Sequence, residues 1–381
     1  MKERLGRKAL VLKVDQKFVC VLCVLLAIVI VVGFLCVSDN VETTGGVEQV
    51  DVKLMDRFDM ALTNEISEAM DGVLSIEKVY WLSDDDKVAP EPDQTRFGST
   101  KDPSSLGWLL EEAGEILNGQ ETTFHTGIKI APRSDVRYYL DETIFAITWK
   151  QAIKGGIYTI SEVKIKHPSQ LRRFLSGGEY GSGVLMQTTQ MAASVNAVVA
   201  SSGDFYSFRQ HGVIVYDGKV QRVNSKYVQT CYIDDKGDML FSYAGQLPDK
   251  RTAQEFVDAN NIRFSLAFGP VLVENGEYVP CKGYVIGEIF EDYPRAALCQ
   301  KDELHYLVVT LNSEHAYRRT SNLKTFAETI MSFGVKQAYT LDGGQTAVIV
   351  MNDKLVNSVL GGNQRNISDI FYFATAMPEG Q

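Results

Sequence analysis

Three short polar clusters in the second half of the chain combine carboxylates, an arginine and glycines. They are Ser202-Gly203-Asp204, with Arg209 and His211 close behind; Tyr293-Pro294-Arg295; and Asp342-Gly343-Gly344-Gln345-Thr346. Glycines beside the acids remove side-chain bulk, so a ligand can approach the backbone there. Two carboxylates and a guanidinium are a minimal set for cleaving a glycosidic bond next to a phosphate. Asp204, Asp342 and Arg295 are therefore candidate catalytic residues. The candidate substrate-binding residues are Ser202, Gly203, Arg209, His211, Gly343, Gly344, Gln345 and Thr346.

Each cluster taken singly is also an ordinary structural sequence. Asp-Gly pairs are common turn formers, and an arginine after a proline can form a structural ion pair. Other catalytic signatures are absent from the sequence: there is no G-x-S-x-G, no Walker loop and no H-E-x-x-H. The five histidines include no H-x-x-x-H, so the spacing predicts no metal site. The sequence names no cofactor.

The elements that must position these clusters are mostly strands. Residues 212–220, 270–279 and 348–356 each read as a strand, a two-residue turn that tolerates positive φ, and a return strand. Residues 231–243 predict a fourth hairpin. Residues 158–166 and 196–200 predict two further strands. The first cluster therefore follows directly on a strand end.

Towards the C-terminus the pattern changes to strand, helix, strand. Residues 304–311 and 337–341 predict strands, and between them Ser321 could cap a helix that ends at Gly334. This spacing predicts a parallel pair with a right-handed crossover, which places Asp342 at the carboxyl end of the second strand. We expect an α+β fold, a mixed sheet with several hairpins and one βαβ unit.

The N-terminus carries a different signal. Residues 1–17 hold six basic and two acidic residues, and residues 18–37 hold no charge over 20 residues, enough to cross about 30 Å of hydrocarbon as a helix. A basic flank predicts a cytoplasmic N-terminus, so the remainder is expected outside the cytoplasm, in a single-pass membrane protein. A cleaved signal peptide and a lipid-modified Cys36 are the alternatives. The stretch is long and no A-x-A site follows it, which favours an uncleaved anchor.

Residues 38–120 are expected to form an extracytoplasmic linker and helical stalk. Residues 38–50 are polar, residues 52–76 have helical apolar spacing that could support self-association, residues 83–105 predict a loop, and residues 106–117 predict a short helix. The expected domains are thus a basic tail (1–17), a transmembrane helix (18–37), this linker and stalk (38–120), and a large domain (121–381).

Composition limits the function classes. The 381 residues are 45% hydrophobic and 23% charged, which is ordinary for a globular chain. The net charge of −10 argues against nucleic acid as a partner, because binding it requires a basic face. Beyond the apolar stretch, Cys231, Cys281 and Cys299 allow at most one disulfide.

The order of four sequence blocks is specific. They are NAVVASSGDFYSFRQHGVIVYDGKV (196–220), FSLAFGPVLVENGEYV (264–279), YPRAALCQ (293–300) and LDGGQTAVIVMNDKLVN (341–357), which leads into Arg365-Asn366-Ile367-Ser368-Asp369. With a helix ahead of the last block, residues 121–377 resemble the phosphodiester glycosidase family, which includes the enzyme that uncovers mannose 6-phosphate. Many bacterial members are exported or membrane-anchored, so the resemblance implies a bacterial, membrane-anchored relative.

The resemblance implies hydrolysis of a sugar-1-phosphodiester or a related cell-envelope glycan. Arg295 would bind the phosphate, with Arg209 or His211 assisting. Asp342 and Asp204 would serve as base, nucleophile or metal ligand, and the sequence does not separate these roles. Asp204, Arg295, Asp342, Gly343 and Gly344 match the family's pattern.

The chain departs from that pattern at five positions. Ser202 stands where Asn is usual, Ala296 replaces Thr, and Gln345, Thr346 and Ala347 replace a glycine and two serines. These changes leave three functions open. The first is an anchored glycosidase, and the second is a catalytically inactive glycan-binding or scaffold protein on the same fold. The third is a bare membrane-tethered structural module.

Overall fold

The computed structural model describes residues 88–118, 131, 134–281, 283–284, 289–312 and 320–376. The expected basic tail, membrane span, polar linker and helix at 52–76 lie outside these ranges. Within them, no helix has the length and apolar character needed to cross a bilayer. The chain divides into two units, Met1–Val52 and Lys53–Gln381, and every described residue belongs to the second.

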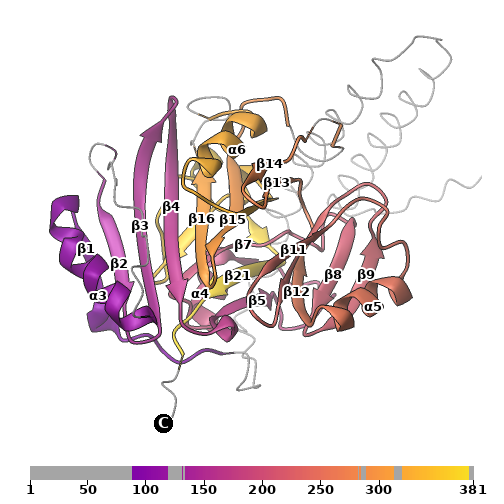
Figure 1. Cartoon of the computed structure of the whole chain (residues 1–381), viewed down its shortest axis with the longest axis horizontal. Coiled ribbons are helices and arrows are strands. Elements are labelled where there is room, and N and C mark those ends of the chain that lie inside the picture. The colour runs from indigo at the N-terminus through magenta and orange to yellow at the C-terminus, as the bar shows by residue number, and fades with distance from the viewer. Residues whose placement is uncertain are drawn as a thin grey trace, which may run out of the picture. The chain divides into compact units, whose positions relative to one another are not determined.

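A nine-stranded sheet forms the centre of this unit, and all of its neighbouring strands are antiparallel (Figure 1). Its strands, in spatial order, are β1 (Phe97–Thr100), β2 (Val136–Leu140), β3 (Ile144–Ile153), β4 (Gly156–Ile165), β16 (His305–Leu311), β15 (Arg295–Asp302), β17 (Gln337–Leu341), β13 (Val271–Glu274) and β14 (Glu277–Tyr278).

Smaller sheets complete the fold. A five-stranded sheet has the order β19 (Lys354–Leu355), β18 (Ile349–Met351), β7 (Val199–Ser202), β21 (Asp369–Phe373) and β5 (Leu171–Leu175). A three-stranded sheet has the order β11 (Met239–Ser242), β10 (Thr230–Asp234) and β12 (Ile262–Leu266). Two ribbons pair β8 (Gly212–Tyr216) with β9 (Lys219–Asn224), and β6 (Met186–Gln187) with β20 (Asn366–Ile367).

Both faces of the nine-stranded sheet are buried. Along β15, Ala297 and Cys299 pack in the core that includes α3 (Gly107–Asn118) and α6 (Leu323–Met331), while Ala296 and Leu298 pack in the core shared with β7 and β21. This alternation is the period of two expected of a strand between two layers. The far side of the five-stranded sheet is covered by α4 (Thr188–Ser194), and α5 (Lys250–Ala259) packs beside β9 and β12. The 3-10 turns are η3 (Gln94–Arg96), η4 (Pro103–Leu106), η5 (Pro168–Gln170), η6 (Gly344–Thr346) and η7 (Leu360–Gly362).

The α+β prediction is confirmed, with many strands and few helices, and all four predicted hairpins are present. They are β8–β9, β13–β14, β18–β19 and β10–β11. The turn residues Asp217 and Asn275 have φ of 48° and 53°, the left-handed region that a two-residue hairpin turn requires.

Three local predictions were wrong. The strands at 304–311 and 337–341 (β16 and β17) point the same way but are not neighbours, because β15 lies between them and pairs antiparallel with both. The helix cap is Asn322, whose side chain accepts a hydrogen bond from the Thr325 amide at 2.9 Å, and not Ser321. The expected loop at 83–105 contains β1, which pairs with β2.

The sequence places the start of the large domain at residue 121. Two elements before that residue, β1 and α3, pack with the large domain. β1 extends the nine-stranded sheet, and Leu109, Ala113 and Leu117 of α3 are fully buried in its core. Residues 97–118 therefore pack as part of the large domain.

Candidate active site

Antiparallel pairing brings Arg295 and Asp342 to one edge of the central sheet. Arg295 is the first residue of β15, and Ala296 beside it pairs with Leu341, the last residue of β17. Because the start of one strand meets the end of its antiparallel neighbour, Asp342 emerges beside Arg295. Both line a cavity of about 30 Å³, whose walls are Arg209, Phe268, Tyr293, Pro294, Arg295, Thr340, Leu341, Asp342, Gly343 and Arg365.

Three arginines from distant segments line this cavity. The Arg209 guanidinium carbon lies 5.2 Å from the centre of the Phe268 ring. Arg295 is buried, donates from Nη2 to the Glu291 carbonyl at 2.8 Å, and lies 6.0 Å from the Tyr293 ring centre. Burial lowers the pKa of Arg365, while the nearby Asp342 carboxylate raises it. Three guanidinium groups around one carboxylate make a cavity suited to an anionic ligand such as a phosphate.

Asp342 is the single acidic side chain among the residues lining that cavity. Burial raises its pKa above the usual value for an aspartate, because the charged form loses hydration. Arg209 and Arg365 act in the opposite direction and lower it, as do the Thr346 hydroxyl and the Gly343 amide. The site thus holds a carboxylate whose protonation depends on two flanking cations.

The glycine turn after Asp342 is held against the backbone before Arg295. The Gly344 amide donates to the Pro294 carbonyl at 3.2 Å, and a Cβ on Gly343 would press against the same oxygen. Gly344 has φ of +66°, which favours glycine. The turn therefore fixes the position of the carboxylate relative to the guanidinium.

Asp204 does not line the cavity. It is fully buried, and its Oδ1 accepts from Arg173 Nη2 at 2.7 Å while its Oδ2 accepts from the Ala267 amide at 2.6 Å. Arg173 Nη2 also donates to Asp369 Oδ2 at 2.9 Å. The pKa of Asp204 is raised to about 7, because the effects of burial and of the Asp369 charge outweigh the lowering effect of Arg173. We call Arg173, Asp204 and Asp369 the buried ion cluster.

The buried ion cluster shapes the loop that carries Arg209. The Asp369 carboxylate accepts from the amides of Asp204 at 3.2 Å and Phe205 at 3.0 Å. A side chain on Gly203 would collide with that carboxylate, so this glycine allows the close approach. The Arg209 amide then donates to the Phe205 carbonyl at 3.2 Å. Ala267, whose amide donates a hydrogen bond to Asp204, directly precedes Phe268, which lines the cavity.

Of the predicted substrate-binding residues, Arg209 and Gly343 line the cavity. The Ser202 hydroxyl donates to the Thr346 carbonyl, and the Thr346 hydroxyl donates to the Gly343 carbonyl at 2.7 Å. His211 lies beside Asn224 at 3.4 Å. The structure places six residues outside the cavity lining: Ser202, Gly203, His211, Gly344, Gln345 and Thr346.

Sequence reasoning did not select Arg365, Arg173 or Asp369 as site residues. Arg365 and Asp369 lie in the segment that follows the last sequence block, and that adjacency was the available signal. Arg173 carries no sequence signal, because its role depends on two acids that are 31 and 196 residues away.

No group of three metal-binding side chains occurs within the described ranges. Cys231, Cys281 and Cys299 are all free thiols. The structure thus shows neither the disulfide that the cysteine count allows nor a metal cluster among these residues.

The chain is similar to proteins of known family and structure. Residues 195–374 match the model of the phosphodiester glycosidase family, so the predicted resemblance is confirmed. No curated protein matches. Among solved structures, similarity is found to the zebrafish N-acetylglucosamine-1-phosphodiester alpha-N-acetylglucosaminidase catalytic domain, auto-inhibited by its pro-peptide (16% identity, 61% of this chain and 83% of that chain, TM-score 0.47).

Two bacterial structures are also similar. One is a hypothetical protein from Synechocystis (15% identity, 64% of each chain, TM-score 0.44). The other is a putative exported protein from Burkholderia pseudomallei K96243 (13% identity, 58% of this chain and 74% of that chain, TM-score 0.38).

Proposed function

We propose, from the match of residues 195–374 to the phosphodiester glycosidase family, that the protein hydrolyses a sugar-1-phosphodiester or a related cell-envelope glycan. The observation that carries the proposal is the joint lining of one cavity by Arg209, Arg295, Arg365 and Asp342. The arginines supply charge for a phosphodiester, and the carboxylate supplies the reactive oxygen.

The reaction breaks the bond between the anomeric carbon and the phosphate oxygen. Water supplies the oxygen that ends on the sugar, and the bonding electrons leave with the phosphate. A phosphomonoester is already stable as an anion, so it needs less general-acid help than an alcohol leaving group. The enzyme must mainly hold the phosphate and stabilise positive charge at the anomeric carbon.

We assign phosphate binding to Arg295, Arg209 and Arg365. A forked guanidinium can donate to two phosphate oxygens at once. Asp342 acts as base towards water or as nucleophile at the anomeric carbon, and both roles need its ionised form. A cavity of about 30 Å³ is too small for a sugar ring, so the sugar would lie at its mouth with its phosphate turned towards the arginines.

We assign Asp204 a positioning role. Both of its carboxylate oxygens are bound, one by Arg173 and one by the Ala267 amide. It would act through the loop of Arg209 and through Phe268, without touching substrate.

We further propose that residues 18–37 anchor the chain in the cell membrane, with the N-terminus cytoplasmic and the large domain extracytoplasmic. The support is the uncharged stretch and its basic flank. We also propose that residues 52–76 form a helix through which two copies of the chain associate. Extraction of the full chain by detergent but not by alkaline carbonate supports the anchor, and release by carbonate alone contradicts it.

The proposed reaction is tested with the full-length chain and a sugar-1-phosphodiester, by following release of reducing sugar. Asp342→Asn and Arg295→Ala should both abolish turnover while circular dichroism and thermal midpoint stay near those of the parent. Turnover that persists in Asp342→Asn would overturn the assignment.

A glycan-binding protein without turnover is the second candidate. Ser202 and Thr346 depart from the family pattern, both donate their hydroxyls to backbone carbonyls, and neither residue lines the cavity. Glycan binding that Arg295→Ala removes, with no turnover in the parent, would favour this candidate.

A further inference from the structure

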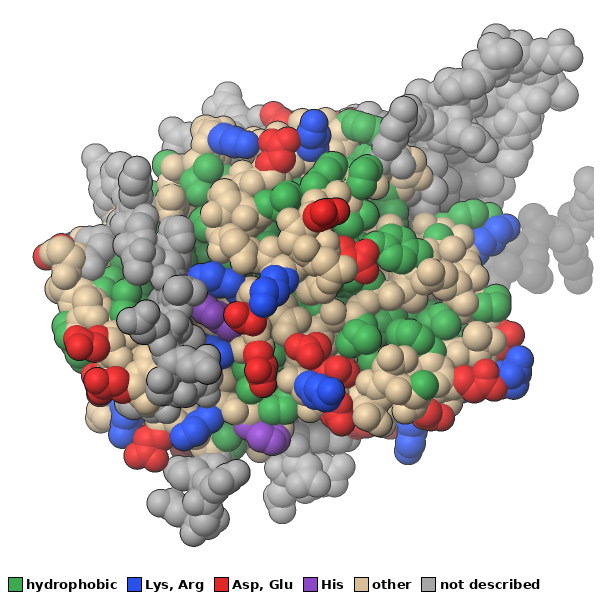
Figure 2. Space-filling model, in the orientation of Figure 1, with side chains coloured by type: hydrophobic (Ala, Val, Ile, Leu, Met, Phe, Trp, Pro, Cys, Tyr) green, Lys and Arg blue, Asp and Glu red, His purple; other side chains and the backbone are tan. Residues whose placement is uncertain are grey.

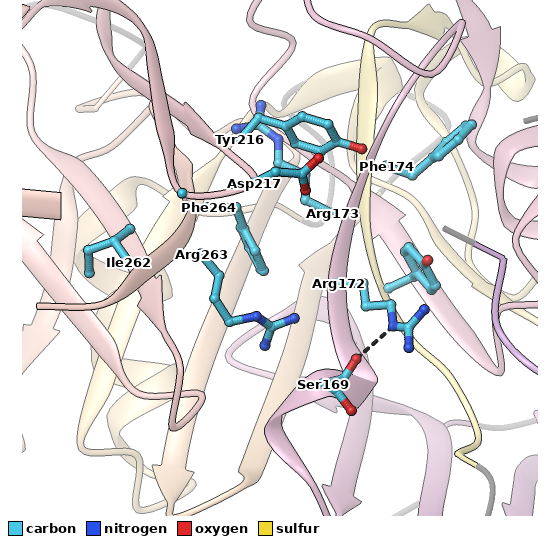
Figure 3. A pocket seen from close by; sticks show the side chains of 11 residues that line it. Ser169, Arg172, Arg173, Phe174, Tyr216, Asp217, Ile262, Arg263 and Phe264 are labelled. Carbon is cyan, nitrogen blue, oxygen red and sulfur yellow. Dashed lines mark hydrogen bonds between the residues drawn. The ribbon is translucent and has the colours of Figure 1, made fainter. Parts of the chain in front are cut away.

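A second, larger pocket lies at the free edge of the five-stranded sheet. β5 is the last strand of that sheet, and the pocket of about 370 Å³ lies between β5 and the segments Tyr216–Gly218 and Ile262–Phe264 (Figure 3). It shares no lining residue with the cavity of Asp342. Its volume falls in the range of small-molecule sites.

Two arginines extend into this pocket from different sheets. Arg172 belongs to β5 and Arg263 to β12, and Figure 3 shows their guanidinium groups approaching the loop of Ser169 from opposite sides. Arg172 Nε donates to the Ser169 carbonyl at 2.6 Å. Burial lowers the pKa of Arg263, and the positive charge of Arg172 lowers it further. The two cations therefore repel each other across the pocket.

Arg263 has donor capacity left over. It donates to the carbonyls of Pro168 at 2.7 Å and Leu171 at 3.0 Å, from its two terminal nitrogens. A guanidinium carries five N–H groups. Three of them therefore have no acceptor in the part of the chain that the structure describes. An anion at this position would accept these hydrogen bonds and relieve the repulsion from Arg172.

The rest of the pocket suits a polyhydroxylated ligand. The exposed Asp217 carboxylate stands at the rim and can accept hydrogen bonds from hydroxyl groups. Tyr216, Phe264 and Tyr372 give the walls an apolar component. Arg173 also lines the pocket, and its two ion pairs are with the carboxylates of the buried ion cluster.

We propose that this pocket binds a saccharide unit that carries one anionic group, phosphate or carboxylate, with the anion held between Arg172 and Arg263. The inference goes beyond hydrolysis at Asp342 and does not depend on it. On an anionic glycan, such a subsite would hold a second unit of the chain away from the bond that is cut.

The test is calorimetric titration of the full-length chain with four probes: glucose 6-phosphate, glucuronate, inorganic phosphate and glucose. The two anionic sugars should bind, and glucose should not. Arg263→Ala and Arg172→Gln should each weaken binding roughly tenfold, since each removes charge-assisted hydrogen bonds. Raising salt should weaken it as well.

Three controls make the outcome decisive. Arg251→Ala removes an exposed arginine of α5, paired with Glu255 at 2.6 Å, and should leave binding unchanged. Arg295→Ala removes a phosphate-binding arginine of the Asp342 cavity, so every probe is also titrated into this variant, and binding that persists there belongs to the second pocket. Thermal midpoints show whether a variant is folded. The proposal is overturned if no probe binds to Arg295→Ala, if glucose or inorganic phosphate binds to it as tightly as the anionic sugars, or if adding Arg263→Ala or Arg172→Gln to it leaves binding unchanged in a folded protein.

Discussion

Burial and charge act in opposite directions on Arg365. Its side chain is almost fully buried, burial lowers its pKa, and the Asp342 carboxylate offsets only part of that effect. Arg365 lines the cavity beside Asp342. We therefore propose that it binds the phosphate in the transition state.

Arg365→Ala should lower kcat/KM about 100-fold, the usual scale for losing one preorganised electrostatic contact. The measurement is steady-state kinetics on a sugar-1-phosphodiester. Arg251→Ala changes an exposed arginine that does not line this cavity, so it is the matched control and should behave like the parent. Equal losses in both variants would contradict the role of Arg365.

The pH profile should report the carboxylate of Asp342. Burial raises its pKa, and the Arg209 charge lowers it. Arg209→Gln removes the lowering charge, so the pKa of Asp342 rises and the ionised form is lost at a higher pH. The acid limb of the kcat profile should therefore move to higher pH. A shift to lower pH, or none, would show that ionised Asp342 is not the reacting form.

Of the three residues that the sequence offered as catalytic candidates, Asp342 and Arg295 line one cavity and Asp204 does not. The position of Asp342 follows from a local pattern, the end of a predicted strand, whereas Arg295 was selected only as an arginine in a polar cluster. The burial of Asp204 could not be predicted, because it depends on Arg173 and Asp369, whose approach is set by the pairing of β21 with both β5 and β7.

At the scale of elements, the buried ion cluster joins β5, β21 and the loop after β7. Arg173 is its single cation, and it also donates to the Ser265 carbonyl of β12. Its removal leaves two carboxylates buried at one point, whereas Asp204→Asn leaves the pair of Arg173 and Asp369 intact.

Arg173→Met should therefore cost about 3–5 kcal/mol in the free energy of unfolding, as expected for breaking a buried ion pair. Asp204→Asn should cost less, because the ion pair of Arg173 and Asp369 remains and burial already raises the pKa of Asp204, which favours a neutral side chain there. Urea denaturation measures both. The reverse order of destabilisation would contradict this account of the cluster.

Adding one methyl group to the turn between β17 and η6, by Gly343→Ala, should lower activity. A Cβ on Gly343 would press on the Pro294 carbonyl and shift Asp342 relative to Arg295. Gly343→Ala should lower kcat at least tenfold, because geometry at a reacting group is strict. Gly107→Ala, where a Cβ meets nothing within 4 Å, is the control and should leave kcat unchanged. Unchanged kcat in Gly343→Ala would show that the turn does not position the carboxylate.

The hairpins were predictable because all their signals lie in one short continuous segment, which contains two strands rich in β-branched residues and a turn that tolerates positive φ. The insertion of β15 between β16 and β17 was not, because strand order across a sheet is decided by packing over the whole chain. That insertion is what places Arg295 beside Asp342.

The whole chain is acidic, with a net charge of −10, while its proposed reactive cavity is lined by three arginines and one aspartate. Figure 2 shows acidic and basic side chains mixed over one face, so attraction of an anionic substrate has to be local. Binding at either pocket should weaken at high salt less than binding to a uniformly basic surface would.

The most direct test of the central claim is hydrolysis of a sugar-1-phosphodiester in water labelled with oxygen-18, with mass analysis of the released phosphomonoester. Cleavage between the anomeric carbon and oxygen predicts a phosphomonoester without label, because water attacks the sugar. Label in the phosphomonoester would show attack at phosphorus, and would contradict a glycosidase built on Asp342 and its three arginines.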